Sequence, residues 1–258
     1  MEEKTILADP VAQKENNNVV VVDIKGLKKS FGSKKVLESI TLTLAKGENL
    51  VVLGKSGTGK SVLIKCMMRL IQADEGEIQV LGKNISELKE KELNDMRKSI
   101  GFLFQSAALY DSMTVGENLE FPLRGEQKVS AEEKSKRVEE ALQNVGLEDS
   151  INKMPSELSG GMRKRIGLAR TMMLKPKIIL YDEPTTGLDP ITSKEISKLI
   201  LDVQKKYNTS SIIITHDMEC ARITANRIII LKEGKVAMEG TYEELKKSED
   251  EWIRSFFE

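Results

Sequence analysis

A glycine-rich segment near the start of the chain constrains the fold more than any other feature of the sequence. The segment reads Gly54-Lys55-Ser56-Gly57-Thr58-Gly59-Lys60-Ser61. A short apolar run at residues 49–53 precedes it, and residues 61–70 after it have a helical pattern. A loop of this composition between a strand and a helix turns successive backbone N–H groups inward, where they bind phosphate oxygens. The segment therefore predicts a buried strand, a phosphate-binding loop and a helix, in that order.

The side chains at the end of this loop predict the kind of phosphate compound. Lys60 places a positive charge at the β- and γ-phosphates of a nucleoside triphosphate, and the Ser61 hydroxyl is a ligand for magnesium. The helix that begins near Lys60 adds the positive end of its dipole. The residues of the segment that we expect at the nucleotide are Gly54, Ser56, Gly57, Thr58, Gly59, Lys60, Ser61 and Val62.

An acidic pair follows a second apolar run. Residues 178–181 are mostly apolar and end in Asp182 and Glu183. Carboxylates are costly to bury without a cation, so they belong at the open carboxyl edge of a parallel sheet. We expect Asp182 to hold magnesium, directly or through water, and Glu183 to orient and polarise the attacking water. The alternative for the pair taken alone is an exposed strand end without function.

Two further polar residues follow strand-like runs. His216, the single histidine of the chain, comes directly after the apolar residues 211–215. An imidazole at the sheet edge could contact the γ-phosphate and hold the attacking water, although an isolated histidine is more often structural. Gln105 follows residues 100–104, and its amide could reach magnesium or water. We therefore predict both residues at the catalytic edge.

A second glycine turn, Leu158-Ser159-Gly160-Gly161, precedes a predicted helix at residues 162–174. Free N–H groups and a serine hydroxyl at a helix start bind anions. The chain has one phosphate-binding loop, so this second site lacks a phosphate partner within it. A head-to-tail pair of chains solves this, each offering Ser159 and Gly161 to the γ-phosphate held by the other. The alternative is an ordinary N-capped helix.

The alternation of strands and helices predicts the fold class. Buried strands are expected at residues 177–181, 211–215 and 227–231, and a helix at 191–205 with Asp189 as its N-cap. Residues 19–24 and 40–44 suit antiparallel strands, and residues 106–164 lack strand runs and contain helical stretches such as 131–145. We predict an α/β fold, a P-loop NTPase (RecA-like) core with a small antiparallel β subdomain and an inserted α-helical subdomain.

Composition narrows the classes of partner and compartment. Lys+Arg and Asp+Glu balance at 40 each, which argues against nucleic acid as a partner. Cys66 and Cys220 fall in mostly apolar stretches and are expected to be buried, reduced thiols. No apolar run approaches the roughly 20 residues of a membrane span. Residues 1–18 are polar, which predicts a flexible tail without a secretory signal.

In this order the motifs resemble those of ATP-binding cassette (ABC) nucleotide-binding subunits over residues 19–258. The Walker A, signature and Walker B motifs correspond to residues 54–61, 158–161 and 178–183. Gln105 resembles the Q-loop glutamine, residues 187–189 the D-loop, and His216 the switch histidine. The resemblance implies ATP and Mg²⁺ as cofactors and a homodimer around two ATP molecules. It also implies that Phe31 stacks on adenine and that Asp189 and Gly160 lie at the nucleotide.

Other positions are similar to one branch of the family. Val62 stands where most members have Ser or Thr, and Met162 stands where most have Gln. Residues 104–115 resemble the corresponding segment of the ATPases of Mla-type systems. That resemblance implies an integral membrane permease, an MCE-domain lipid-binding protein, phospholipid as cargo, and a peripheral location on the cytoplasmic face of the inner membrane. An importer ATPase for polar amino acids and a soluble ABC protein remain alternatives.

The stretch after Gln105 is unusually apolar for a loop. It contains Ala107, Ala108, Leu109, Tyr110 and Met113. We expect these side chains to form a groove for a short cytoplasmic helix of a permease. The alternative is that they pack on the chain's own surface.

Overall fold

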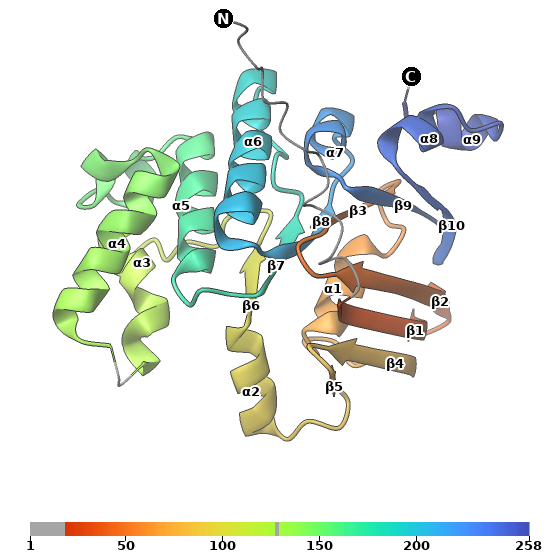
Figure 1. The fold of residues 1–258 in the computed structure, drawn as a ribbon, viewed down its shortest axis with the longest axis horizontal. Coiled ribbons are helices and arrows are strands. Elements are labelled where there is room, and N and C mark those ends of the chain that lie inside the picture. The colour runs from red at the N-terminus through yellow and green to blue at the C-terminus, as the bar shows by residue number, and fades with distance from the viewer. Residues whose placement is uncertain (1–18, 127–128, 258) are drawn as a thin grey trace, which may run out of the picture.

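The computed structural model describes residues 19–126 and 129–257, so the tail predicted at residues 1–18 lies outside the described residues. The centre of the molecule is a sheet with strand order β10-β9-β3-β8-β7-β6 (Figure 1). Its members are parallel except the edge strand β10, which pairs antiparallel with β9. The strands are β3 (Asn49–Gly54), β6 (Ile100–Leu103), β7 (Ile178–Asp182), β8 (Ser210–Ile214), β9 (Arg227–Lys232) and β10 (Lys235–Gly240).

The sequence predicted most of this sheet. The predicted ends of β3, β7, β8 and β9 lie within one residue of the observed ends. These strands are apolar runs because helices cover both faces of the sheet. β10 was not predicted, since five of its six residues are polar, small or exposed at the sheet edge. Its pairing with β9 is a tertiary contact that its own composition does not indicate.

A second, antiparallel sheet lies beside the first and has strand order β2-β1-β4-β5. The predicted antiparallel pair is confirmed, and both strands are longer than expected because they continue to a tight turn after Phe31. β4 was not predicted, since its sequence Glu-Gly-Glu-Ile-Gln-Val is mostly polar. The strands are β1 (Val20–Phe31), β2 (Lys34–Ala45), β4 (Glu75–Val80) and β5 (Lys83–Asn84).

Two apolar cores cover the two faces of the central sheet. Alternate residues of β3 divide between them: Leu50 and Val52 join the core shared with α1 (Lys60–Met67) and the antiparallel sheet. Val51 and Leu53 join the core beneath α6 (Pro190–Tyr207) and α7 (Met218–Thr224). The other helices beside the sheets are α2 (Glu90–Lys98), α8 (Tyr242–Lys246) and α9 (Glu251–Arg254). The alternation of β3 explains why both of its faces are apolar.

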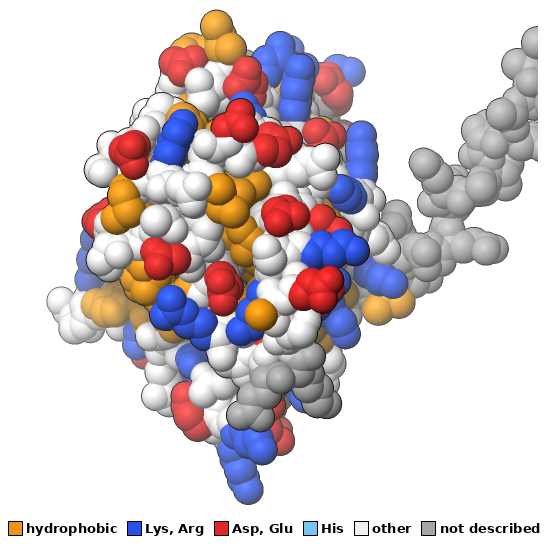
Figure 2. Space-filling view, turned by 90° about the vertical axis from the view of Figure 1, so that its left-hand side faces the viewer, with side chains coloured by type: hydrophobic (Ala, Val, Ile, Leu, Met, Phe, Trp, Pro, Cys, Tyr) orange, Lys and Arg blue, Asp and Glu red, His pale blue; other side chains and the backbone are white. Residues whose placement is uncertain are grey.

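A helical lobe projects from the sheet edge at β6, on the left of Figure 1. The lobe has an apolar core of its own, which includes Ile166 and Ala169 of α5 and Met173 directly after α5. Because these residues follow residue 164, the lobe boundaries at about 106–164 stay a prediction. Figure 2 views the molecule from this side, and acidic and basic side chains are interspersed over it. The elements are α3 (Val115–Glu120), η1 (Phe121–Gly125), α4 (Ala131–Val145), η2 (Glu148–Ser150), η3 (Pro155–Glu157) and α5 (Gly160–Met172).

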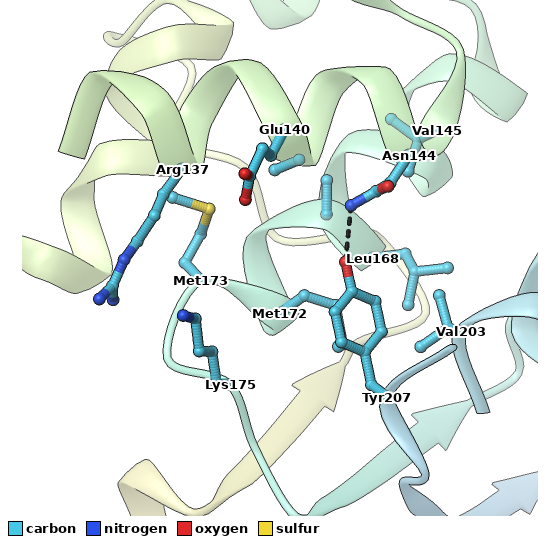
Figure 3. A pocket seen from close by; sticks show the side chains of 12 residues that line it. Arg137, Glu140, Asn144, Val145, Leu168, Met172, Met173, Lys175, Val203 and Tyr207 are labelled. Carbon is cyan, nitrogen blue, oxygen red and sulfur yellow. Dashed lines mark hydrogen bonds between the residues drawn. The ribbon is translucent and has the colours of Figure 1, made fainter. Parts of the chain in front are cut away.

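The lobe meets the sheet domain along a seam between α4, α5 and the end of α6. A cavity of about 60 Å³ lies in this seam, lined by apolar side chains such as Met172 and Val203 (Figure 3). The Asn144 side-chain nitrogen donates a hydrogen bond of 2.7 Å to the Tyr207 hydroxyl across the seam. The Lys206 ammonium donates a second, 2.6 Å bond to the side-chain oxygen Oδ1 of Asn144. The lobe is thus joined to the sheet domain by apolar packing and by polar contacts.

The two cysteines agree with the prediction. Cys66 on α1 and Cys220 on α7 are buried and unbonded to one another. Burial raises the pKa of each thiol to about 11, so both stay neutral near pH 7. Within the described part of the chain, no helix is both long and apolar enough to cross a membrane.

Candidate active site

The glycine loop joins β3 to α1, as predicted, and its backbone is sharply curved. Gly59, the N-cap of α1, has φ 95°, and a side chain there would come within 2.8 Å of the Leu37 methyl group. The Lys60 ammonium donates to the Gly54 carbonyl oxygen at 2.7 Å, and the residue is 7% exposed. Burial lowers its pKa, and Glu183 and Asp182 oppose that shift. The loop thus holds a cation beside a helix N-terminus.

A pair of oxygen atoms next to the loop fits a magnesium ion. The Ser61 hydroxyl donates to Oδ1 of Asp182 at 3.0 Å, although 121 residues separate them in the sequence. Asp182 ends β7, which lies two strands from β3 in the sheet. Burial raises the pKa of Asp182, opposed by the hydrogen bond from Ser61. A hydroxyl and a carboxylate are the hard oxygen ligands that Mg²⁺ prefers, so these two residues would hold the ion.

Glu183 and His216 are in direct contact. Nδ1 of His216 lies 2.8 Å from Oε2 of Glu183, and the Thr186 hydroxyl donates to the same oxygen at 3.1 Å. The Glu183 side chain is 14% exposed, whereas that of His216 is 66% exposed. Glu183 has φ 51°, an uncommon left-handed conformation for a residue with a side chain. These contacts fix the direction of the carboxylate.

Most of the predicted catalytic residues line one cavity of about 480 Å³. Gln105 reaches it from the end of β6, and Val36 of β2 forms part of its wall. Phe31 lies at the end of β1, is 49% exposed, and has the Lys29 ammonium 5.3 Å from its ring centre. The lining residues are Val36, Ser56, Gly57, Gly59, Lys60, Ser61, Val62, Gln105, Glu183, Thr186 and His216.

The predicted second anion site does not join this cavity. Ser159 is the N-cap of α5, and its Oγ accepts a 3.2 Å hydrogen bond from the Met162 N–H. Asp189 caps α6 and accepts from the Ile191 and Thr192 N–H groups. Gly160 lines a neighbouring cavity of about 500 Å³, which shares Gln105 and Thr186 with the cavity around Lys60. Ser159, Gly161 and Asp189 are not among the described residues lining the cavity around Lys60.

Glycine at position 161 has a packing reason as well. A side chain there would come within 2.5 Å of the Thr192 methyl group, so the start of α5 lies close against α6. This contact and the Ser159 cap confirm a regular helix start, which was the structural alternative for the motif. Regular capping and anion binding are compatible, because the first N–H groups of a helix have no partners within it.

The structure corrects one part of the predicted groove after Gln105. Ala107 is only 1% exposed and packs against Gly167, and Leu109 packs on the core of the lobe. Tyr110 is 43% exposed, with its ring 4.6 Å from that of Phe121. Ala107 therefore offers almost no exposed surface to a docking partner, although it borders a cavity of about 500 Å³ together with Ala108 and Leu109.

Besides Val36 in the cavity wall, sequence reasoning missed two polar residues that contact Glu183. Thr186 contacts the Glu183 carboxylate, as described above. Lys164 on α5 is 5% exposed, and its ammonium donates to the Glu183 carbonyl oxygen at 3.0 Å. Burial lowers the pKa of Lys164 to about 8. Lys164 stands between Arg163 and Arg165, and such a basic run predicts a solvated face, so the sequence held no signal for its burial.

The glycine loop, the acidic pair and the histidine around one cavity define a P-loop nucleoside triphosphatase. Residues 37–186 match the ABC transporter family, and the chain belongs to this family. It is therefore an ATP-binding, ATP-hydrolysing subunit coupled to transport.

Three curated relatives are similar to this chain over most of its length. Probable ribonucleotide transport ATP-binding protein mkl of Mycobacterium leprae is 42% identical over 92% of this chain and 68% of its own length. Methionine import ATP-binding protein MetN of Rhizobium johnstonii is 40% identical, over 85% and 60% respectively. Protein TRIGALACTOSYLDIACYLGLYCEROL 3, chloroplastic, of Arabidopsis thaliana is 37% identical, over 94% and 74%. The chain thus spans between 60% and 74% of these relatives.

Two solved structures share the fold. One is a dimeric ATP-binding cassette in a post-hydrolysis state with ADP and Pi, with TM-score 0.78 and 34% identity. It covers 85% of this chain, and the similarity includes 98% of that chain. The other is cbiO1 from Clostridium perfringens, part of the ABC transporter complex cbiONQ, with TM-score 0.82 and 30% identity. That similarity covers 92% of this chain and 94% of the other.

Proposed function

We propose that the cavity around Lys60 binds Mg²⁺-ATP and hydrolyses it with the residues predicted from the sequence. Lys60 and the loop amides bind the β- and γ-phosphates, and Ser61, Asp182 and Gln105 hold magnesium. Glu183 orients and polarises the attacking water. The His216 imidazole, fixed by its 2.8 Å contact with Glu183, contacts the γ-phosphate and the water. Phe31, exposed at the end of β1, stacks on adenine.

The second part of the proposal is that two chains complete each site. The observation that carries it is that Ser159, at the start of α5, and Gly161 are not among the described residues that line the cavity around Lys60. Ser159, Gly160 and Gly161 then bind the γ-phosphate of the partner chain, and Asp189 lies at the same interface. The dimeric state of the related cassette supports this arrangement. Two ATP molecules would be enclosed between two copies of the chain.

A mixing experiment tests the shared site. A Ser159→Arg chain and a Lys60→Ala chain are each inactive as homodimers. In the mixed dimer, the intact loop of the first chain faces the intact Ser159 of the second, so one site is complete. ATPase activity should therefore reappear on mixing, up to the level of a wild-type and Lys60→Ala mixture. Activity in that control mixture with none in the test mixture would reject the shared site.

We further propose that the dimer drives an integral membrane permease that moves phospholipid with an MCE-domain lipid-binding protein. The likeness of residues 104–115 to Mla-type ATPases supports this, as does a relative whose name contains a glycolipid. The alternative is import of a small polar solute, which the names of the methionine and ribonucleotide relatives favour. In either case the chain would be held at the cytoplasmic face of the inner membrane by the permease.

The exposed residues after Gln105 are the proposed contact with the permease. Ala108 and Tyr110 are exposed, and Met113 is partly so. A short permease helix that covered them would link the membrane subunit to Gln105 at the nucleotide. Tyr110→Asp should keep ATP binding and lose co-purification with the permease from detergent extracts. Pull-down of the permease that is unchanged by this substitution would contradict the contact.

A reconstitution experiment separates the two kinds of cargo. The complete transporter is placed in vesicles of defined phospholipid, and ATP-dependent movement of labelled phospholipid, methionine and a ribonucleotide is measured in parallel. If the cargo is lipid, the wild-type transporter should move labelled phospholipid when ATP is added, and a Glu183→Gln transporter should not. Uptake of methionine or the ribonucleotide, with no ATP-dependent movement of phospholipid, would replace the lipid proposal with the small-solute alternative.

A further inference from the structure

A second buried lysine faces the acidic pair at the end of β7. Lys60 approaches the pair from α1, and Lys164 approaches it from α5, the helix that begins with the signature motif. Both are nearly inaccessible, at 7% and 5% exposure. Burying an ammonium group is costly unless nearby groups compensate its charge. Near Lys164 these are the Glu183 carbonyl oxygen and the negative charges of Glu183 and Asp182.

The hydrogen bond from Lys164 is made to the main chain of the catalytic glutamate. The Glu183 N–H donates to the Ile214 carbonyl oxygen at 2.9 Å, and the Glu183 side chain contacts His216 and Thr186. These contacts come from β8, the segment after it and the loop of Glu183 itself. The 3.0 Å bond from Lys164 ties the same residue to α5. It supports a left-handed conformation, φ 51°, that is unfavourable for glutamate without such contacts.

We propose that Lys164 is a positioning residue for Glu183. Its ammonium group holds the peptide after Glu183, so that the carboxylate points into the cavity around Lys60. The same bond couples Glu183 to the start of α5 in its own chain, because Ser159 lies five residues before Lys164, about 7.5 Å along the helix. This coupling rests on the shared site proposed above: when Ser159 engages the ATP of one site, α5 adjusts the glutamate of the other.

The first test compares two substitutions at Lys164 in the full-length chain. Lys164→Met removes the charge and the donor at similar length, whereas Lys164→Arg keeps both. Lys164→Met should lower kcat by about tenfold, which is about 1.4 kcal/mol, with the KM for ATP within about twofold. Lys164→Arg should recover most of the lost rate. Lys198→Met, the same substitution at an exposed site on α6, is the matched control and should leave both constants unchanged.

A double-mutant cycle with Glu183→Gln separates positioning from general damage to the fold. If Lys164 acts through Glu183, Lys164→Met should not lower the residual rate of a Glu183→Gln chain any further. An equal fold-loss in both backgrounds would overturn the proposal, as would a wild-type kcat for Lys164→Met. If Lys164→Met fails to fold, Lys164→Gln, a neutral donor, replaces it and should give an intermediate kcat. A wild-type kcat for that variant would also overturn it.

The shared site has its own readout, so the two proposals fail separately. ATP-dependent dimerisation of the Lys164 variants, followed by sedimentation, should match that of the wild-type chain. Dimerisation and Ser159 rescue in trans, without any effect of Lys164→Met on kcat, would reject the positioning role alone. In the opposite case, Lys164→Met lowers kcat but the Ser159→Arg and Lys60→Ala mixture shows no rescue. That result would reject the shared site and the coupling through α5, and it would leave the positioning contact with Glu183 supported.

Discussion

Asn118 on α3 should contribute strongly to stability, because its side chain holds the loop after Gln105. The residue is fully buried. Its Oδ1 accepts from the Tyr110 N–H at 2.8 Å, and its Nδ2 lies 3.1 Å from the Tyr110 and Met113 carbonyl oxygens and 3.0 Å from that of Thr114. One side chain thus satisfies the backbone on both sides of the segment that leads into α3.

Replacing Asn118 with alanine removes these bonds, which are partly buried. The Tyr110 and Thr114 carbonyl oxygens keep backbone N–H partners, whereas the Tyr110 N–H and the Met113 carbonyl oxygen lose the Asn118 side chain. An amide group has two N–H donors, so the loss amounts to two donor bonds and one acceptor bond. At about 1 kcal/mol each, the free energy of unfolding should fall by about 3 kcal/mol. For a chain near this size that corresponds to a Tm lower by about 6–12 °C.

Thermal unfolding followed by circular dichroism measures this effect. Asn94→Ala is the matched control, because that amide is exposed and bonds only to the nearby Arg97 among the described residues. The control should change the stability by less than about 0.5 kcal/mol. Asn118→Ala should also weaken co-purification with the permease, because the Tyr110 backbone loses its support. A Tm for Asn118→Ala that equals that of the control would refute this reasoning.

Three further predictions concern the active site and the buried thiols. Lys60→Ala should abolish ATP binding, measured by fluorescent-nucleotide titration, and turnover; wild-type ATPase activity would contradict the role of the loop. Glu183→Gln should retain ATP affinity, lose turnover by about two orders of magnitude and accumulate an ATP-bound dimer in sedimentation. A variant that still turns over freely would exclude Glu183 as the base. Burial raises the pKa of Cys66 from 9.0 to about 11, so a thiol reagent at pH 8 should label it only after unfolding. Since the folded thiol holds its proton more tightly, its contribution to stability is present below pH 9 and should be lost as pH rises to about 11, which a pH series of Tm values checks.

Local sequence determined the parts of this protein whose physical cause lies within a few residues. The curved loop needs glycine where φ is positive, as at Gly59. Asp189 caps α6 because its carboxylate reaches the N–H groups two and three residues later. The buried parallel strands are continuous apolar runs, since both faces of the sheet are covered. These features were predicted with nearly correct ends.

Only the tertiary structure decided which distant residues meet. β4 and α2 are both mostly polar. β4 is a strand because it pairs with β1, and α2 packs on the apolar core through its own Leu93 and Met96. The burial of Lys164 depends on the approach of α5 to the end of β7, which brings its ammonium to Glu183, 19 residues away. The sequence of the basic run at residues 163–165 does not indicate which of its side chains is buried and which is exposed to water. Burial is a property of the packed chain, and so the contact between Lys164 and Glu183 could not be predicted from the sequence.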